Sequence, residues 1–528
     1  MTDCVPSGAI GSRITCDGEY ATVLYVGSVP PTAGLWLGVE WDNPNRGKHD
    51  GSHEGVQYFK CNHPQAGSFI RPKKANFGVD FLTALKSRYV FKGRLNDENS
   101  QEEALIIGKK KVELVIVESA EDESQLFKLQ NISLRDCDVS CAGRDGDILK
   151  VCPNITALNL AQNLFSHWDH ISNIAHQLRN LEILDLSGNR LRVPSDPGLL
   201  SSAFMNLKVL SLSHAKMTWA NVLHCAPMWP TLEELHLVSN DITVLERPIR
   251  VLQSLKLLDI SNNKLLDGNQ LSELANLPEL EKLILINTGV SSVCFSDVGF
   301  GSKSVMFSSL KHLSVDNNNI SHWSFINELD KIKSLHSLSC QNNPVLEAET
   351  NLETARQFII AKIGGLKFLN KTEILPEERK GAELDYRKTF GTAWLKAGGN
   401  KDPNLNAPSQ AFLTEHPRYP CLIQKYGAPE EGELKQQEPF ALKNQLLTLN
   451  IKCPEKSDQK PLLKKLPDSM TVQKVKGLLC RLLKVPGSEL RLSYESMKMK
   501  GVEIELENDL KPLQFYCVES GDCILVRW

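Results

Sequence analysis

A nine-fold repeat in the middle of the chain constrains its fold more than any other feature. The pattern L-x-x-L-x-L-x-x-N-x-L starts at nine positions from 129 to 335, at intervals of 23 to 30 residues. Five copies are clear and start at Leu181, Leu232, Leu255, Leu310 and Leu335. Four are degenerate and start at Leu129, Ile155, Leu207 and Leu280. A unit this short cannot bury its apolar face alone, so residues 129–365 are predicted to stack into a solenoid.

The pattern is similar to that of leucine-rich repeats. Each copy should supply one short strand whose leucines point inward. The polar residue at the ninth position should hydrogen-bond the backbone turns of adjacent coils, and it is asparagine in six copies: Asn163, Asn189, Asn240, Asn263, Asn318 and Asn343. Cys137, Ala215 and Thr288 stand at this position in three degenerate copies.

Outward-pointing positions of these strands should line the concave face, which solenoids use to grip folded partners. The candidates for partner binding are Arg135, Asp185, Glu234, His236, Asp259, Lys282, His312 and Asp316. For each one alone, a solvated surface position is the simpler interpretation. The carboxylates belong to separate coils, so they are not expected to form a catalytic pair.

Further segments complete the solenoid. The insertion GFGSKSVMF, residues 299–307, should form a loop, and Trp168, Trp219 and Trp323 recur at a place that favours the core. Residues 366–426 turn charged and helical, as a cap for the last coil would. Residues 427–440 are polar and indicate a linker.

The second strong signal is Gly47-Lys48-His49-Asp50-Gly51, in which two glycines bracket a cation, an imidazole and a carboxylate. Glycines and aromatic residues alternate around it, including Trp36 and Phe69. Glycine permits positive φ and close backbone approach, whereas exposed aromatic rings supply flat contact area. The segment therefore indicates a binding surface.

Residues 8–78 resemble the CAP-Gly domain, a small β module whose loop usually reads GKNDG. The resemblance implies binding of the acidic C-terminal tail of α-tubulin, with its terminal aromatic ring in a groove and its carboxylate held by nearby donors. His49 replaces the usual Asn and makes that position titratable near neutral pH. Six basic and two acidic side chains between residues 46 and 74 agree with an acidic ligand. The expected tail-binding residues are Trp36, Trp41, Gly47, Lys48, His49, Asp50, Gly51, Phe59, Phe69 and Arg71.

The C-terminal segment, residues 441–528, reads as two strands, a helix over TVQKVKGLLCRLLK and further strands. Ser469 and Thr471 are candidate helix caps. This order fits a β-grasp and resembles ubiquitin-like domains. Because no diglycine follows Trp528, we expect a docking module rather than a conjugated one.

Composition excludes several other classes. A chain of 528 residues with a net charge of −3 suggests three or four domains and no nucleic-acid surface. No signal peptide or apolar run of membrane-spanning length is present, so a cytoplasmic, cytoskeleton-associated protein is expected. The fourteen cysteines lack metal-ligand spacing, and no phosphate-binding loop or catalytic motif occurs. We expect no enzyme activity, cofactor or metal.

The ordered combination of these modules makes the chain a multidomain α+β protein that resembles the tubulin-folding cofactor E family. The resemblance implies chaperone activity in tubulin folding and microtubule organisation, with α-tubulin, the α/β-tubulin heterodimer and other tubulin-folding cofactors as partners. We expect capture of α-tubulin through its tail and body, and participation in assembly and dissociation of the heterodimer. Two alternatives stay open: a ubiquitin-like-domain adaptor that delivers tubulin to the proteasome, and a microtubule scaffold. Residues 79–128, a connecting segment with a strand-like VELVIV, have no assigned role.

Overall fold

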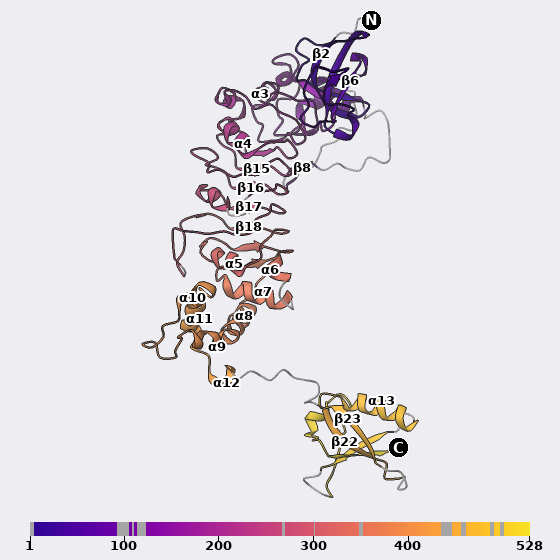
Figure 1. Cartoon of the computed structure of the whole chain (residues 1–528), viewed down its shortest axis with the longest axis vertical. Coiled ribbons are helices and arrows are strands. Elements are labelled where there is room, and N and C mark those ends of the chain that lie inside the picture. The colour runs from indigo at the N-terminus through magenta and orange to yellow at the C-terminus, as the bar shows by residue number, and fades with distance from the viewer. Residues whose placement is uncertain are drawn as a thin grey trace. The chain divides into compact units, whose positions relative to one another are not determined.

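A computed structural model of the chain describes residues 5–91, 105–107, 110–112, 123–266, 270–299, 301–347, 352–434, 446–455, 461–485, 490–496 and 501–528. Residues 113–117 of the strand-like VELVIV, residues 121–122 and residues 435–440 of the predicted linker lie outside these ranges. Close contacts divide the chain into two compact units, Met1–Pro429 and Glu430–Trp528. Each unit is described by itself, with the element labels of Figure 1.

The N-terminal domain is a four-stranded antiparallel sheet in the order β1-β2-β3-β6. Alternate residues of its strands point inward, so Ile14, Val23, Leu37 and Val39 form the centre of a small core. A short hairpin, β4–β5, lies between β3 and β6 in the chain. The elements are β1 Arg13–Cys16, β2 Glu19–Val29, β3 Thr32–Trp41, η1 Pro44–Arg46, β4 Ser52–His53, β5 Val56–Gln57, β6 Gly67–Ile70 and η2 Pro72–Lys74.

The repeats form an 11-stranded sheet whose neighbours follow chain order and pair in parallel as far as β20 (Figure 1). Each repeat strand begins two residues after the first leucine of its copy, and its middle residue, such as Leu158 or Leu283, is buried. The predicted solenoid is therefore confirmed. The strands are β10 Asn131–Ser133, β12 Ala157–Asn159, β13 Ile183–Asp185, β14 Val209–Ser211, β15 Glu234–His236, β16 Leu257–Asp259, β17 Lys282–Ile284, β18 His312–Ser314, β19 Ser337–Ser339, β20 Phe368–Leu369 and β21 Thr372–Glu373.

Buried asparagines tie adjacent coils together, and Asn263 represents them. Its Nδ2 donates to the carbonyl oxygens of Leu237 at 2.9 Å and Ile260 at 2.8 Å. Its Oδ1 accepts from the backbone nitrogens of Asn240 at 3.1 Å and Ile242 at 3.2 Å. In each copy, the residue just before the ninth position of the pattern also adopts a left-handed backbone conformation, which favours Asn, Asp and Gly. The residues there are Asp136, Gln162, Gly188, His214, Ser239, Asn262, Asn287, Asn317 and Asn342, all with positive φ.

The other side of the coils is built from helices and 3-10 turns. Three helices start at the recurring tryptophans: α3 Trp168–Gln177, α4 Trp219–Cys225 and α5 Trp323–Leu329. Trp168 and Trp219 are 1% exposed, which confirms their predicted place in the core, and Trp323 is partly buried against it. The remaining elements of this side are α2 Asp147–Val151, η6 Pro197–Phe204, η7 Ala226–Met228 and η8 Gln270–Asn276.

Elements from residues 79–128 cover the first coil. Strand β7 pairs in parallel with β11, and Phe81 and Leu85 of the following helix enter the solenoid core. The segment that the sequence indicated only as a connection thus closes the N-terminal end of the apolar spine. Its elements are β7 Val79–Asp80, α1 Phe81–Lys86, η3 Ser87–Phe91, the hairpin β8 Leu105–Ile107 with β9 Lys110–Val112, η5 Glu123–Lys128, and the partner strand β11 Val139–Cys141.

Helices cover the last coil. A separate aromatic core joins Phe358, Tyr386, Trp394, Phe412 and Tyr419. Within it the Tyr386 hydroxyl and His416 Nδ1 are 2.6 Å apart. The helices are α6 Pro344–Glu347, α7 Leu352–Lys362, α8 Pro376–Thr389, α9 Gly391–Lys396, α10 Gln410–Glu415 and α11 Tyr419–Tyr426. The short helix α12 Glu431–Leu434 belongs to the second unit.

The C-terminal unit is a β-grasp, in which a five-stranded sheet of order β23-β22-β26-β24-β25 packs on one helix. Val472, Val475 and Leu479 are the fully buried residues of that helix. Thr471 occupies the N-cap position, as the sequence suggested. The ubiquitin-like fold is therefore confirmed. Its elements are β22 Leu446–Lys452, β23 Leu462–Pro467, α13 Val472–Leu483, β24 Arg491–Glu495, β25 Glu503–Glu505, η11 Leu513–Tyr516 and β26 Cys523–Arg527.

Within the described ranges, no helix is both long enough and apolar enough to cross a membrane. The same residues contain no group of three or more His, Cys, Asp or Glu side chains arranged to hold a metal ion.

Candidate functional site

The loop from Gly47 to Gly51 is fixed by backbone hydrogen bonds to β6. The Lys48 nitrogen donates to Gly67 O at 2.7 Å, and the Gly67 nitrogen donates to His49 O at 2.8 Å. Both bracketing glycines are required by the packing. A Cβ at Gly47 would lie 1.9 Å from Gln65 O, and one at Gly51, where φ is +102°, would lie 2.0 Å from Phe59 O. The loop therefore has one defined shape.

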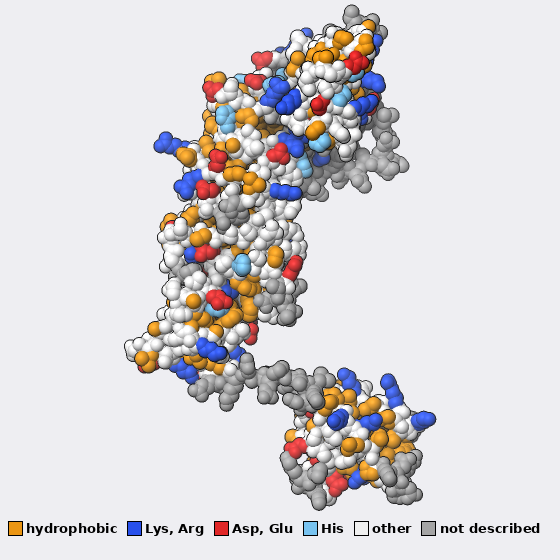
Figure 2. All heavy atoms as spheres, in the orientation of Figure 1, with side chains coloured by type: hydrophobic (Ala, Val, Ile, Leu, Met, Phe, Trp, Pro, Cys, Tyr) orange, Lys and Arg blue, Asp and Glu red, His pale blue; other side chains and the backbone are white. Residues whose placement is uncertain are grey.

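The side chains within the loop hold that shape. His49 Nδ1 accepts from the Gly51 backbone nitrogen at 3.0 Å, and Asp50 Oδ1 accepts from the nitrogen of Ser52 at 3.0 Å and from its hydroxyl at 2.5 Å. Burial lowers the pKa of His49, and the Ser52 hydrogen bonds lower the pKa of Asp50. His49 is thus neutral at pH 7, whereas Lys48 is exposed beside it. Figure 2 shows Lys, Arg and His side chains close together on this end of the chain.

An aromatic cluster lies next to the loop, with Phe69 at its centre. The Phe69 ring centroid is 5.0 Å from that of His49, 5.4 Å from that of Phe59 and 5.5 Å from that of Tyr58. His53 and Tyr25 complete the cluster at 6.2 Å and 6.4 Å. Most pairs are edge-on, the arrangement that aromatic rings prefer. We call this cluster of six side chains the aromatic groove, after the groove that the CAP-Gly resemblance implies; the name denotes the residues alone.

Glycine at position 38 lets the groove form. A Cβ there would lie 2.3 Å from the Phe59 ring and 2.9 Å from Tyr25 Cβ. The ring of Phe59 therefore rests directly on the backbone of β3.

Trp36 and Arg71 form a stacked pair beside the groove. The Arg71 guanidinium carbon lies 3.7 Å from the centre of the Trp36 ring, while Nη1 donates to the carbonyl oxygens of Ala33 at 2.9 Å and Leu35 at 3.2 Å. Trp36 Nε1 donates to Thr32 Oγ1 at 2.8 Å. Arg71 thus has an internal task, which is to hold the end of the β2–β3 hairpin and to orient Trp36.

The structure places Trp41 differently from the other aromatic candidates. It is 4% exposed and belongs to the domain core, with the Arg46 guanidinium 4.1 Å from its ring centre. Its ring supports the loop from inside the domain. Of the other aromatic candidates, Trp36 and Phe69 are half-buried and Phe59 is 7% exposed. Sequence reasoning missed Tyr25, His53 and Tyr58. A register shift in β2 between Val23 and Tyr25 breaks the alternation that would have placed Tyr25.

Six of the eight concave-face candidates lie within repeat strands. Glu234, Lys282 and His312 occupy the first position of their strands, and Asp185, His236 and Asp259 occupy the third. Arg135 and Asp316 lie two residues beyond the ends of β10 and β18, so they belong to the turns.

The aspartates of this set make hydrogen bonds within the solenoid. Asp185 and Asp259 each accept from the backbone nitrogen and hydroxyl of the serine two residues later, and Asp316 accepts from Ser339 Oγ at 2.8 Å. Arg135 Nε donates to Gln162 Oε1 at 3.1 Å. These contacts give the carboxylates a structural role in the turns. Of the first-position residues, Glu234 and Lys282 are half-buried and His312 is exposed.

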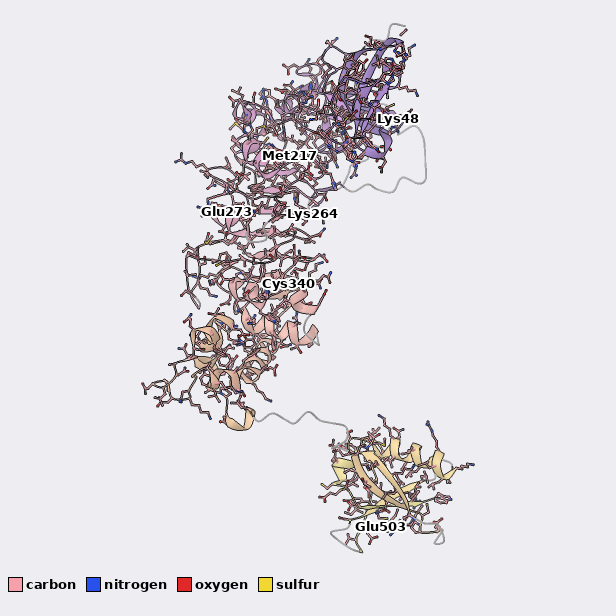
Figure 3. All side chains as sticks on the ribbon, viewed as in Figure 1. Lys48, Met217, Lys264, Glu273, Cys340 and Glu503 are labelled. Carbon is pink, nitrogen blue, oxygen red and sulfur yellow. The ribbon has the colours of Figure 1, made fainter. Side chains whose placement is uncertain are left out.

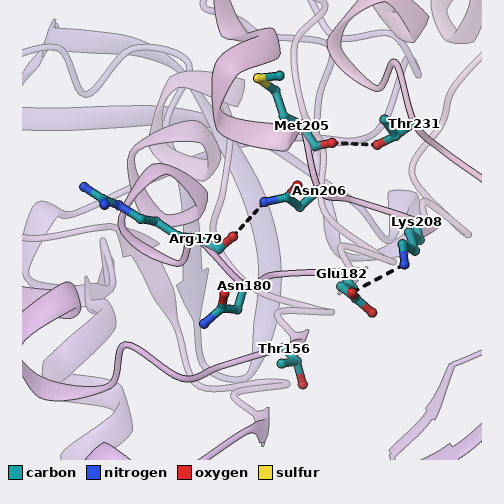
Figure 4. Close-up of a pocket in the computed structure, with 8 residues that line it drawn as sticks. All are labelled: Thr156, Arg179, Asn180, Glu182, Met205, Asn206, Lys208 and Thr231. Atoms are coloured by element: carbon teal, nitrogen blue, oxygen red, sulfur yellow. Dashed lines mark hydrogen bonds and ion pairs between the residues drawn. The ribbon is translucent and has the colours of Figure 1, made fainter.

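A shallow pocket on the solenoid is occupied by the coil's own contacts (Figure 4). Thr231 Oγ1 donates to Met205 O at 2.7 Å, Asn206 Nδ2 donates to Arg179 O at 2.8 Å, and Lys208 pairs with Glu182 at 3.4 Å. The last pair joins residues that directly precede two adjacent strands. Two further ion pairs occupy the same position along the sheet, Lys256–Glu233 at 2.9 Å and Lys311–Glu281 at 2.6 Å. The pocket is therefore a feature of coil stacking.

Comparison with known proteins agrees with this architecture. The family model described as CAP-Gly domain matches residues 10–75. The whole chain is 63% identical over 529 residues to Tubulin-specific chaperone E of Xenopus laevis, and 58% identical over 529 residues to the Homo sapiens protein of that name. Each comparison covers 100% of both chains. The chain is also similar to the solved C-terminal ubiquitin-like domain of mouse tubulin-specific chaperone e, at 75% identity over 16% of this chain and 87% of that one, with a TM-score of 0.16.

The fold and these relatives define a three-module chaperone cofactor with a CAP-Gly domain, leucine-rich repeats and a ubiquitin-like domain. Such a chaperone is not an enzyme, as the sequence predicted. The chain belongs to the tubulin-specific chaperone E family.

Proposed function

We propose that this protein captures α-tubulin at two places, through its acidic C-terminal tail and through its folded body, and takes part in assembly and dissociation of the α/β-tubulin heterodimer. The observation that carries the proposal is the aromatic groove beside an exposed Lys48 on a rigid loop. A tail that ends in an aromatic residue and a free carboxylate, as the CAP-Gly resemblance implies, has both a flat apolar and an anionic part. The groove and Lys48 match these two parts in chemistry.

Loop rigidity supports this assignment. Binding of a short anionic peptide already costs the conformational entropy of the peptide. A preformed site adds no ordering cost of its own, so it binds more tightly than a site that must become ordered. The backbone bonds between the loop and Gly67, and the His49–Gly51 bond, keep the loop in place without a ligand. His49, in its neutral form, serves here as a loop-shaping acceptor.

The solenoid is proposed to contact the α-tubulin body through first-position strand residues such as Glu234, Lys282 and His312. Repeat proteins present such rows on a continuous surface that suits a folded partner. Once the tail is bound, the body would be held at an effective concentration of roughly mM, so two weak contacts combine. Binding promotes assembly or dissociation of the heterodimer only if the protein binds α-tubulin alone and α-tubulin in the heterodimer with different affinities.

Isothermal titration of the full chain with a tail peptide tests the tail-binding step. Replacing Lys48→Ala, or removing the terminal aromatic residue of the peptide, should each weaken binding about tenfold or more, as loss of a central contact does. Lys74→Ala is the matched control, since Lys74 is exposed in the same domain but outside the loop. Unchanged isotherms for both changes would contradict the tail-binding step.

The proteasome-adaptor alternative assigns the activity to the ubiquitin-like domain. The outward side of its sheet carries the Arg527–Glu503 ion pair, and the Ser493 hydroxyl donates to the same carboxylate. The domain also exposes apolar side chains, including Leu463 and Leu510. We propose another tubulin-folding cofactor as its docking partner. Proteasome pull-down by residues 441–528 would support the adaptor instead.

A further inference from the structure

We propose that the CAP-Gly domain and the solenoid form one rigid two-site platform, locked by a polar interface whose residues touch no ligand. The interface joins Arg13, Tyr20 and Asp42 of the CAP-Gly domain to Asp136, Asp138 and Arg190 of the first repeats, and we call these six residues the latch. The inference rests on the proposed two-site capture. It adds that the orientation of the groove on the solenoid is itself a determinant of capture.

The centre of the latch is a shared carboxylate. Arg13, 2% exposed, makes two parallel bonds to Asp42, at 2.7 Å and 2.5 Å. Arg190 of the solenoid lies 3.6 Å from the same carboxylate. The Arg13–Asp42 pair lies within the CAP-Gly domain and holds the Asp42 carboxylate in place, where Arg190 meets it across the interface. Asp42 also lies five residues before Gly47. Through Arg190, the solenoid therefore contacts the segment that leads into the loop of residues 47–51.

A second group of bonds involves the turn of the first repeat. The Tyr20 hydroxyl donates to Asp136 Oδ1 at 2.7 Å and lies 3.0 Å from Gln162 O. Asn76 Nδ2 donates to Asp138 Oδ2 at 2.7 Å. These partners are 116 and 62 residues apart in the chain.

The composition of that turn points to the same role. The first repeat reads Asp136-Cys137-Asp138, and a cysteine replaces the asparagine that ties coils together elsewhere. Two carboxylates beside each other repel in an isolated turn. Docking of Tyr20 and Asn76 supplies a donor for each carboxylate of this turn.

The two surfaces also fit closely in shape. Gly11 has φ of +88°, and a Cβ there would lie 1.7 Å from Nη2 of Arg192. The Arg192 guanidinium thus rests against the backbone of the CAP-Gly domain. Directly after the CAP-Gly domain, the Val79 nitrogen donates to Asp138 O at 2.8 Å, where strand β7 pairs with β11. A salt bridge, hydrogen bonds, steric fit and strand pairing therefore fix the same orientation.

Rigidity has a measurable consequence for binding. A second contact gains most from the first when the connection holds both sites at the matching separation, and it gains less when the connection is loose. Weakening the latch should therefore reduce the affinity for a partner that uses both sites. It should leave each single site unchanged.

The test compares two full-length double variants. Arg190→Ala with Asp136→Gly removes two of the three solenoid residues of the latch, and glycine suits the left-handed backbone at position 136, where φ is 55°. Lys264→Ala with Ser239→Gly is the matched control, because these residues occupy the same two repeat positions farther along the solenoid. Figure 3 labels Lys264 there and Lys48 on the CAP-Gly domain. The conservative variant Tyr20→Phe weakens the latch from the other side and keeps the ring.

Three titrations are made for each protein, with an α-tubulin tail peptide, intact α/β-tubulin, and tubulin from which the tails have been removed. The latch variant should bind the peptide and the tailless tubulin as the control does, and should bind intact tubulin about tenfold or more weakly, within the range of avidity effects. Tyr20→Phe should change binding in the same direction. Equal affinity of the latch and control variants for intact tubulin would overturn the rigid platform. If the unaltered chain does not bind the peptide, the proposed tail capture itself fails, which is a separate result.

Discussion

Arg71 is stacked on Trp36 with its guanidinium carbon 3.7 Å from the ring centre, and the same guanidinium bonds the backbone of the hairpin that carries the ring. Arg71, which was predicted to contact the ligand directly, therefore also holds Trp36, a second predicted contact residue, in position. This double use explains how a small sheet with a core of few residues keeps an aromatic side chain in a defined position at its surface.

Replacement of Arg71 by Lys should disturb this support. Lysine keeps the charge but has neither the planar stacking surface nor the second set of donors. We expect a loss of about 1 kcal/mol in the free energy of unfolding of the domain, together with weaker tail-peptide binding. Thermal unfolding and titration calorimetry measure the two effects. Lys74→Ala, next to the same turn, should change neither, and an unaltered melting curve for Arg71→Lys would contradict the supporting role.

His49 should titrate below its ordinary value of 6.5, because burial lowers its pKa. Its neutral form accepts the Gly51 hydrogen bond, so the folded domain binds fewer protons than the unfolded chain below pH 6.5, and stability falls as the pH drops through the folded pKa. Proton NMR of the imidazole measures the midpoint. Bound acidic peptide should raise it, since a nearby anion favours the charged form. A midpoint above 6.5 in the unbound protein would exclude this account.

Asn263→Ala should destabilise the solenoid strongly. The side chain is fully buried; it donates to three carbonyl oxygens and accepts from two backbone nitrogens of its own and the preceding coil. Leaving these groups without partners should cost about 2 to 4 kcal/mol of unfolding free energy. Urea denaturation followed by circular dichroism measures the loss. Lys264→Ala, one residue later and exposed, is the control, and equal midpoints for the two variants would refute the coil-tying role.

His416 should make the stability of the first unit sensitive to acid. Burial lowers its pKa from 6.5 to about 4, and its Nδ1 lies 2.6 Å from the Tyr386 hydroxyl. Between these values the unfolded chain binds more protons, so stability is full above pH 6.5 and is lost progressively toward pH 4. His416→Gln should flatten this part of the pH profile of unfolding. A variant with the same acid dependence as the unaltered chain would show that other groups are responsible.

The sequence by itself determined the modules, because their signals are local. Leucine spacing fixed the strand positions, since each strand starts two residues after a leucine of the pattern, and the glycines at 47 and 51 marked a loop that no larger residue can form. The helix and the strands of the ubiquitin-like domain followed from their own periodicity. Such features depend on residues close together in the chain. The same residues that produce the sequence pattern therefore also form the local structure.

Only the tertiary structure decided which side chains meet. Tyr58 and His53 contact Phe69 through packing of separate segments of the domain, whereas Trp41, with the same aromatic chemistry as Trp36, faces the core. The bond from Tyr20 to Asp136 spans 116 residues and two modules, so no local pattern contains it. Contacts of this kind depend on how already formed surfaces fit, which is a property of their shapes and charges in three dimensions.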